Sequence, residues 1–145
     1  MCKISFDVPG KPQGKARART VRNNGKTLSY TPDNTVLYEN LIKTCYMSSS
    51  KKIYKNKEPL SIHITAYFSP PVSTSKKKCA RMLAGSEYPV KKPDADNIAK
   101  VVCDALNGVA YLDDTQVCCL TVDKKYGPTA KVSVEIEPIG GDKLA

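Results

Sequence analysis

The stretch from Leu60 to Phe68 strictly alternates apolar and polar residues and contains neither glycine nor proline. Such alternation is typical of a β-strand that buries one face and leaves the other polar. Residues 2–8 alternate in the same way, and residues 116–125 and 130–137 are predicted to form two further strands, joined as a hairpin. The sequence therefore predicts a sheet with one buried face, to which the central strand contributes Ile62, Ile64, Ala66 and Phe68.

Helical periodicity occupies the segments between these strands. Residues 96–107 carry one apolar face, made of Ile98, Val101, Val102, Ala105 and Leu106. Another helix is expected to begin at Thr31-Pro32, with Thr31 as the N-cap. Its apolar residues at helical spacing are Leu37, Leu41, Ile42 and Cys45. A short helix is expected over residues 76–83, before Gly85. This order of elements predicts an α+β fold with helices packed against one mixed sheet.

The length of 145 residues suits one domain, so a single domain over residues 1–145 is expected, with 140–145 as a loose tail. No segment approaches the roughly 20 consecutive apolar residues of a membrane span, and the N-terminus lacks an apolar signal region. The six cysteines are scattered, without the spacing of a zinc site. We therefore expect a cytoplasmic protein with reduced thiols and no membrane partner.

The charge of the chain is unevenly distributed. There are 23 Lys and Arg against 14 Asp and Glu, a net charge of +9. Residues 94–114 hold five acidic residues and one basic residue, a net charge of −4, which leaves 22 basic and 9 acidic residues, or +13, in the remainder. A basic protein of this kind indicates a polyanionic partner, and nucleic acid is favoured because no basic amphipathic helix suited to a membrane surface is present.

Several basic segments are candidate contacts for DNA phosphates. Lys15, Arg17 and Arg19 would lie on one face of an extended segment, and Arg22 continues this row. Lys76, Lys77 and Lys78 form a second cluster that is either a solvated helix face or a phosphate contact. The full set of predicted DNA-binding residues is Lys11, Lys15, Arg17, Arg19, Arg22, Lys76, Lys77, Lys78, Lys91 and Lys92.

The acidic segment begins with two carboxylates at the start of a predicted helix. Pro93 disfavours helical backbone at Lys92, so Asp94 and Asp96 are expected to enter on an extended segment and to project to the same side. Paired carboxylates suit Mg²⁺, which keeps positions for water and phosphate oxygens. Lys100 lies one helical turn beyond Asp96. Each feature alone is also an ordinary helix cap or surface ion pair.

Taken together, these features indicate metal-assisted phosphodiester hydrolysis. Clustered carboxylates repel one another and raise one another's pKa, so such a cluster beside a polyanion is tolerable chiefly if cations bind between them. Divalent ions at such a site polarise the phosphate and activate water. His63 is the only histidine, so a metal site built mainly from imidazoles cannot be formed, and its place on the polar face of a strand favours a surface role.

The acidic segment also carries a family resemblance. The runs Lys92-Pro93-Asp94-Ala95-Asp96-Asn97-Ile98-Ala99-Lys100, Asp104-Ala105-Leu106-Asn107-Gly108 and Tyr111-Leu112-Asp113-Asp114-Thr115-Gln116-Val117 resemble the RusA family of Holliday-junction resolvases. Weaker similarity extends to Val8-Pro9-Gly10-Lys11-Pro12, Tyr30-Thr31-Pro32 and Ser75-Lys76-Lys77-Lys78.

The resemblance implies a small α+β homodimer that binds four-way DNA junctions and nicks two opposing strands with Mg²⁺ or Mn²⁺, without an organic cofactor. The family's catalytic residues fall on Asp94, Asp96, Lys100 and Asp114. The three aspartates are then the metal ligands, and Asp113 is an additional candidate. Two alternatives remain open: a non-catalytic junction- or RNA-binding basic protein, in which the aspartates cap a helix and shape a turn, and a general flap or single-strand nuclease.

Overall fold

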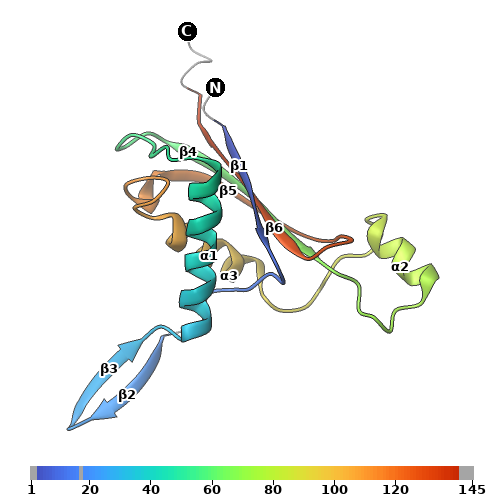
Figure 1. The fold of residues 1–145 in the computed structure, drawn as a ribbon, viewed down its shortest axis with the longest axis horizontal. Coiled ribbons are helices and arrows are strands. Elements are labelled where there is room, and N and C mark those ends of the chain that lie inside the picture. Colours follow the sequence, from blue (N-terminus) through green and yellow to red (C-terminus); the bar gives the residue numbers. More distant parts are fainter. Residues whose placement is uncertain (1–2, 17, 141–145) are drawn as a thin grey trace.

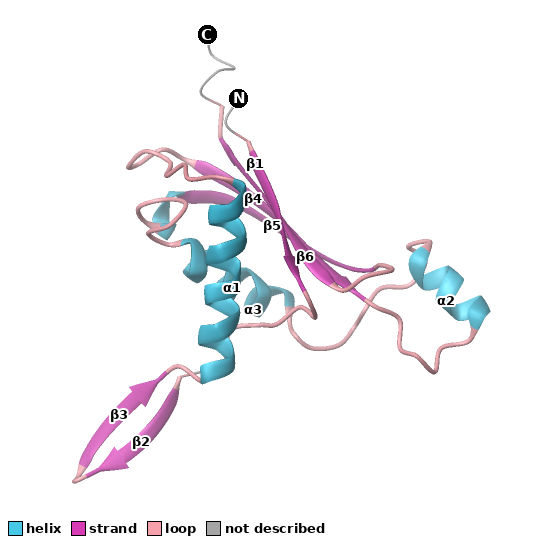
Figure 2. Ribbon diagram, in the orientation of Figure 1, coloured by secondary structure: helices cyan, strands magenta, loops and turns pink. Residues whose placement is uncertain are grey.

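Figures 1 and 2 show how the sheet and helices are arranged in a computed structural model of the protein. The structure describes residues 3–16 and 18–140. The elements in chain order are β1 (Ile4–Pro9), β2 (Arg19–Asn23), β3 (Lys26–Tyr30), α1 (Asp33–Ser49), β4 (Leu60–Phe68), α2 (Lys76–Leu83), α3 (Ala95–Leu106), the 3₁₀ turn η1 (Asp114–Gln116), β5 (Val117–Tyr126) and β6 (Lys131–Pro138). The predicted α+β class is confirmed. Cys2, where the first strand was expected to begin, and the predicted tail beyond Gly140 lie outside the described residues.

The main sheet has the strand order β1-β6-β4-β5. β4 pairs antiparallel with β6 and parallel with β5, so the predicted hairpin between β5 and β6 is wrong. The chain between them passes the end of β4, where the Gly127 amide donates a hydrogen bond to the Phe68 carbonyl at 2.9 Å. The central position of β4 between β6 and β5 has a physical reason. β4 is buried along its whole inner face, and in a central position its backbone N–H and C=O groups have hydrogen-bond partners on both edges.

Helices α1 and α3 cover one face of this sheet (Figure 2). The inner side chains of β4 are buried as predicted, and so is the predicted apolar face of α3. The opposite face of the sheet is polar. There His63 is partly exposed, and its Nε2 atom lies 2.8 Å from Oδ2 of Asp123. The sheet therefore has a covered and an open face, and α3 is held firmly against the covered one.

The buried face of α1 differs from the prediction. Its buried residues are Thr35, Tyr38, Ile42 and Tyr46. Leu37 is 68% exposed. Tyr38, Ile42 and Tyr46 follow one another at i, i+4 spacing, and Tyr46 packs edge-on against Phe6 with ring centroids 5.5 Å apart. The helix also begins one residue later than expected, because Pro32 rather than Thr31 occupies the N-cap position.

Two parts of the chain stand away from the sheet and its helices (Figure 1). One is α2, at the end of a long loop, with the bounds that the sequence predicted. The other, a two-stranded ribbon of β2 and β3, was not predicted. Its turn is Asn24-Gly25, and both residues have positive φ, as a tight two-residue hairpin turn requires. Within the described residues, no helix is both long and apolar enough to span a bilayer.

Candidate active site

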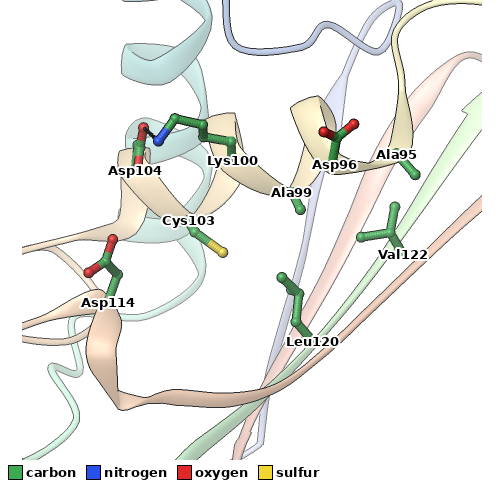
Figure 3. A pocket seen from close by; sticks show the side chains of 9 residues that line it. All are labelled: Ala95, Asp96, Ala99, Lys100, Cys103, Asp104, Asp114, Leu120 and Val122. Carbon is green, nitrogen blue, oxygen red and sulfur yellow. Dashed lines mark ion pairs between the residues drawn. The ribbon is translucent and has the colours of Figure 1, made fainter.

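An open groove runs between α3 and the edge strand β5 (Figure 3). Its volume is about 440 Å³, and it is lined by Ala95, Asp96, Ala99, Lys100, Cys103, Asp104, Asp114, Leu120 and Val122. We call this the acidic groove. Leu120 and Val122 of β5 give the groove an apolar floor. Leu120 remains 46% exposed, because α3 covers the edge strand only partly. The carboxylates stand along its rim, contributed by α3 and by η1.

The predicted extended backbone is present at Asp94 but does not continue to Asp96, and the two carboxylates line different cavities. The helix begins at Ala95, so Asp94 is its N-cap and Asp96 already lies in the first turn. Because the chain changes from extended to helical backbone between them, the period-two alternation of an extended segment does not place the two side chains on one side. Asp96 lines the acidic groove. Asp94 lines a separate hollow of about 370 Å³ with Lys11, Gln13, Lys92 and Asn97.

Asp114 reaches the acidic groove from η1, so the structure brings Asp96, Lys100 and Asp114 to one cavity. Figure 3 shows Asp96 and Asp114 toward opposite ends of this row of side chains. Over residues 3–16 and 18–140, no group of three or more His, Cys, Asp or Glu side chains is placed to share one metal ion. The groove nevertheless offers carboxylate oxygens, the donors that Mg²⁺ prefers, and Mg²⁺ commonly uses only one or two protein carboxylates.

Asp113 has a different role from its neighbour. Its carboxylate accepts a hydrogen bond from the Thr115 amide at 3.0 Å and forms a capping box with Gln116. Hydrogen bonds from the backbone and side chain of Thr115 hold the pKa of Asp113 below its usual value. Asp113 therefore shapes the turn, whereas Asp114 is directed into the acidic groove.

Gln116 is a positioning residue that the sequence analysis missed. Its side chain is buried and bridges two loops. The Oε1 atom accepts from the amides of Leu112 and Asp113, both at 3.1 Å. The Nε2 atom donates to the carbonyls of Lys55 and Glu58 at 2.7 and 3.1 Å. The signal available in the sequence was the Asp-x-x-Gln spacing of a capping box.

Lys15 lies inside an ion-pair network, not on a free basic row. Its Nζ atom is 2.7 Å from Oε2 of Glu39 and 3.3 Å from Oδ2 of Asp104. Burial lowers the pKa of Lys15, but hydrogen bonds and charge from Glu39 and Asp104 outweigh it and raise the value overall. In this structure Lys15 ties the loop before β2 to α1 and α3, and its phosphate contact stays a prediction.

The same network holds Lys100. Its Nζ atom is 3.5 Å from Oδ2 of Asp104, the oxygen that also contacts Lys15. Because Asp104 shares its charge between two cations, and because the Lys100 side chain is 62% exposed, Lys100 remains available to a ligand in the groove. Burial raises the pKa of the Cys103 thiol beside it to about 11, so this thiol is neutral at physiological pH and is not a nucleophile.

The remaining predicted DNA contacts fall into three separate groups around the acidic groove. Arg19 and Arg22 lie on the ribbon, and Arg17 lies outside the described residues. Lys11 and Lys92 line the hollow with Asp94. Lys76, Lys77 and Lys78 lie on α2, and the Nζ atom of Lys91 stands 5.6 Å above the Phe68 ring. The ribbon and α2 project in different directions from α3 (Figure 1), so the predicted DNA contacts on these two elements lie apart from each other.

Gly14 sets the approach of the first loop to α3. A Cβ atom at this position would lie 2.8 Å from Cβ of Asn97 and 3.0 Å from Cβ of Pro93. The next residue donates its amide to the Asn97 carbonyl at 3.0 Å. We expect Gly14→Ala to push the loop from the helix and lower the free energy of unfolding by about 1–3 kcal/mol. Urea unfolding monitored by circular dichroism measures this change. An Ala substitution at the exposed Gln13 is the control, and equal midpoints for both variants would contradict the expectation.

Comparison with known proteins identifies the family of this chain. The family model of the endodeoxyribonuclease RusA matches residues 9–137, which include both flanks of the acidic groove. The chain is also 34% identical over 138 residues to YqaN, an uncharacterised protein of Bacillus subtilis (strain 168), and this match covers 94% of the chain and 96% of the relative. A match of this length, with the motif aspartates on α3 and η1, shows that the chain belongs to the RusA family of endodeoxyribonucleases.

Proposed function

We propose that this chain resolves four-way DNA junctions by paired, symmetric nicks in a reaction that requires Mg²⁺ or Mn²⁺. The observation that carries the proposal is the acidic groove, which Asp96, Lys100 and Asp114 line in a protein whose other segments are strongly basic. Carboxylates beside DNA phosphates are electrostatically unfavourable unless cations compensate them. The family to which the chain belongs supports DNA as the substrate.

Asp96 and Asp114 are the proposed metal ligands in the groove, whereas Asp94, the third aspartate of the sequence prediction, lines the separate hollow. A bound divalent ion supplies Lewis-acid polarisation of the phosphate and a lowered pKa for water. The chain itself supplies the surface on which the scissile strand lies, with an apolar floor at Leu120 and Val122.

Lys100 is the proposed cationic partner of the reacting phosphate. Its ammonium group is held near the groove by Asp104, which also keeps it oriented before DNA binds. As negative charge accumulates on the phosphate oxygens, a fixed ammonium group stabilises the transition state more than the ground state. Lys15 offsets part of the charge of Asp104, so Lys100 is held without being neutralised.

A homodimer is part of the proposal. A four-way junction has approximate two-fold symmetry, and two opposing nicks need two active sites related by a two-fold axis. One chain carries one acidic groove of this composition among its described residues. Gel filtration with light scattering tests this, and a monomer at concentrations that cleave junctions would contradict it.

The test of the function is cleavage of a synthetic mobile four-way junction by the purified protein. With Mg²⁺ or Mn²⁺ we expect paired nicks in opposing strands, no cleavage of a linear duplex of the same sequence, and no cleavage in EDTA. Binding without cleavage in every metal and salt condition would favour the non-catalytic junction- or RNA-binding alternative. Equal cleavage of flap and single-stranded substrates would instead identify a general nuclease that uses the same groove.

A further inference from the structure

The ribbon of β2 and β3 presents an apolar face that nothing in the described chain covers. All ten residues of its strands are exposed, with Val21 at 45%, Leu28 at 55% and Tyr30 at 47% exposure. Isolated two-stranded ribbons are marginally stable in water, and exposed apolar surface on such a ribbon indicates a contact that is completed by a ligand.

The strand register decides which side chains share that face. Val21 pairs with Leu28, and Arg19 pairs with Tyr30. Directly paired residues of antiparallel strands project to the same side, and alternate pairs share a face. One face therefore carries an apolar centre of Val21 and Leu28, with Tyr30 and Arg19 at its base and Lys26 at its tip. The other face is polar and consists of Thr20, Arg22, Thr27 and Ser29.

Charge selects the class of ligand for this face. The segment from Arg19 to Tyr30 contains three basic residues and no acidic residue. A membrane or an acidic protein would also complement this positive charge. However, the chain belongs to a DNA endonuclease family. The ribbon lies directly before α1 in the chain, and α1 packs against α3, which lines the acidic groove. The favoured ligand is therefore DNA at which bases as well as phosphates can be reached.

We propose that the ribbon inserts Val21 and Leu28 as a wedge against the unstacked bases at the branch point of a DNA junction, with Arg19 and Lys26 on the adjoining phosphates. This inference rests on the proposed function and adds the part of the chain that recognises the branch. Apolar wedges of this kind unstack bases, which is costly in an intact duplex and much cheaper where stacking is already interrupted. The wedge thereby favours branched over linear DNA.

The experiment uses the full chain and a four-way junction with 2-aminopurine at the branch point, in EDTA so that binding is measured without cleavage. The test variant is the double substitution Val21→Thr, Leu28→Thr, which keeps β-forming residues in an exposed ribbon. The matched control, Thr20→Ser with Ser29→Thr, alters a directly paired position on the opposite face. Circular dichroism confirms that both variants fold.

For the wild type and the control we expect tighter binding to the junction than to a linear duplex, and a rise in 2-aminopurine fluorescence on binding. For the test variant we expect about tenfold weaker junction binding, the loss of the fluorescence rise, and unchanged duplex binding. Unchanged junction preference and fluorescence in the test variant would overturn the wedge, while metal-dependent junction cleavage by the wild type would leave the proposed function standing. A wild type that binds junctions no better than duplexes would overturn both.

Discussion

Replacement of Asp96 by Asn is expected to abolish junction cleavage while junction binding is retained or strengthened. The substitution keeps the size of the side chain but removes a carboxylate that lines the acidic groove from the first turn of α3. Loss of a metal ligand removes several kcal/mol of transition-state stabilisation, which corresponds to a rate lower by about a thousandfold or more. Binding improves because one negative charge that faces phosphate is gone. Single-turnover cleavage and gel-shift titration on the same junction measure the two effects separately.

The matched control for this variant is Asp113→Asn. Asp113 is also an exposed aspartate of the acidic segment, but its carboxylate caps η1 and does not line the groove. Asparagine caps helical turns about as well as aspartate, so cleavage by this variant should stay close to that of the wild type. Parallel loss of binding and cleavage in Asp96→Asn would show that Asp96 supports the fold rather than the reaction. Equal inactivation by both substitutions would show that total charge matters and position does not.

The parts of the fold that could be predicted are those with a strong local pattern. The bounds of β4 and α2 match the prediction, and α3 differs by one residue at each end, because alternation and helical periodicity are properties of neighbouring residues. The order of strands is not such a property. It depends on which strand pairs with a neighbour along both of its edges. The short connection at Gly127 suggested a hairpin of β5 and β6, but β4 lies between these two strands.

Two local signals were present and were not used. Asn24-Gly25 between β-forming residues is a strong hairpin signal, and it would have predicted the ribbon. On α1, the spacing of Tyr38, Ile42 and Tyr46 gives the buried face once tyrosine is counted as apolar.

The acidic groove was predictable only in part. Asp96 and Lys100 share a helix face by their spacing, and this arrangement follows from the helix alone. The separation of Asp94 from Asp96 depends on the residue at which α3 begins, and helix ends are poorly determined by periodicity. The role of Lys15 depends on Glu39 and Asp104, which come from two different helices and meet it only in the folded chain.

The arrival of Asp114 at the groove likewise depends on a contact across the fold, the bridge made by Gln116. The residue joins the turn before β5 to the loop before β4 through four hydrogen bonds, two accepted and two donated. Leucine in its place has a similar volume and no polar atom. It would leave two amides and two carbonyls beside a buried apolar side chain, and burying a polar group without a partner costs about 1–3 kcal/mol.

We therefore expect Gln116→Leu to lower the free energy of unfolding by about 2–4 kcal/mol, since water can reach some of these groups in the partly exposed loops. Cleavage should fall more than junction binding does, because Asp114 loses its fixed position while the basic segments are unaffected. Urea unfolding and single-turnover cleavage measure the two changes, with Lys55→Gln, an exposed side chain on the same loop, as the control. A stability change below about 0.5 kcal/mol, the usual range for surface substitutions, would mean that the hydrogen bond from the Thr115 amide to the Asp113 carboxylate holds the turn without the bridge.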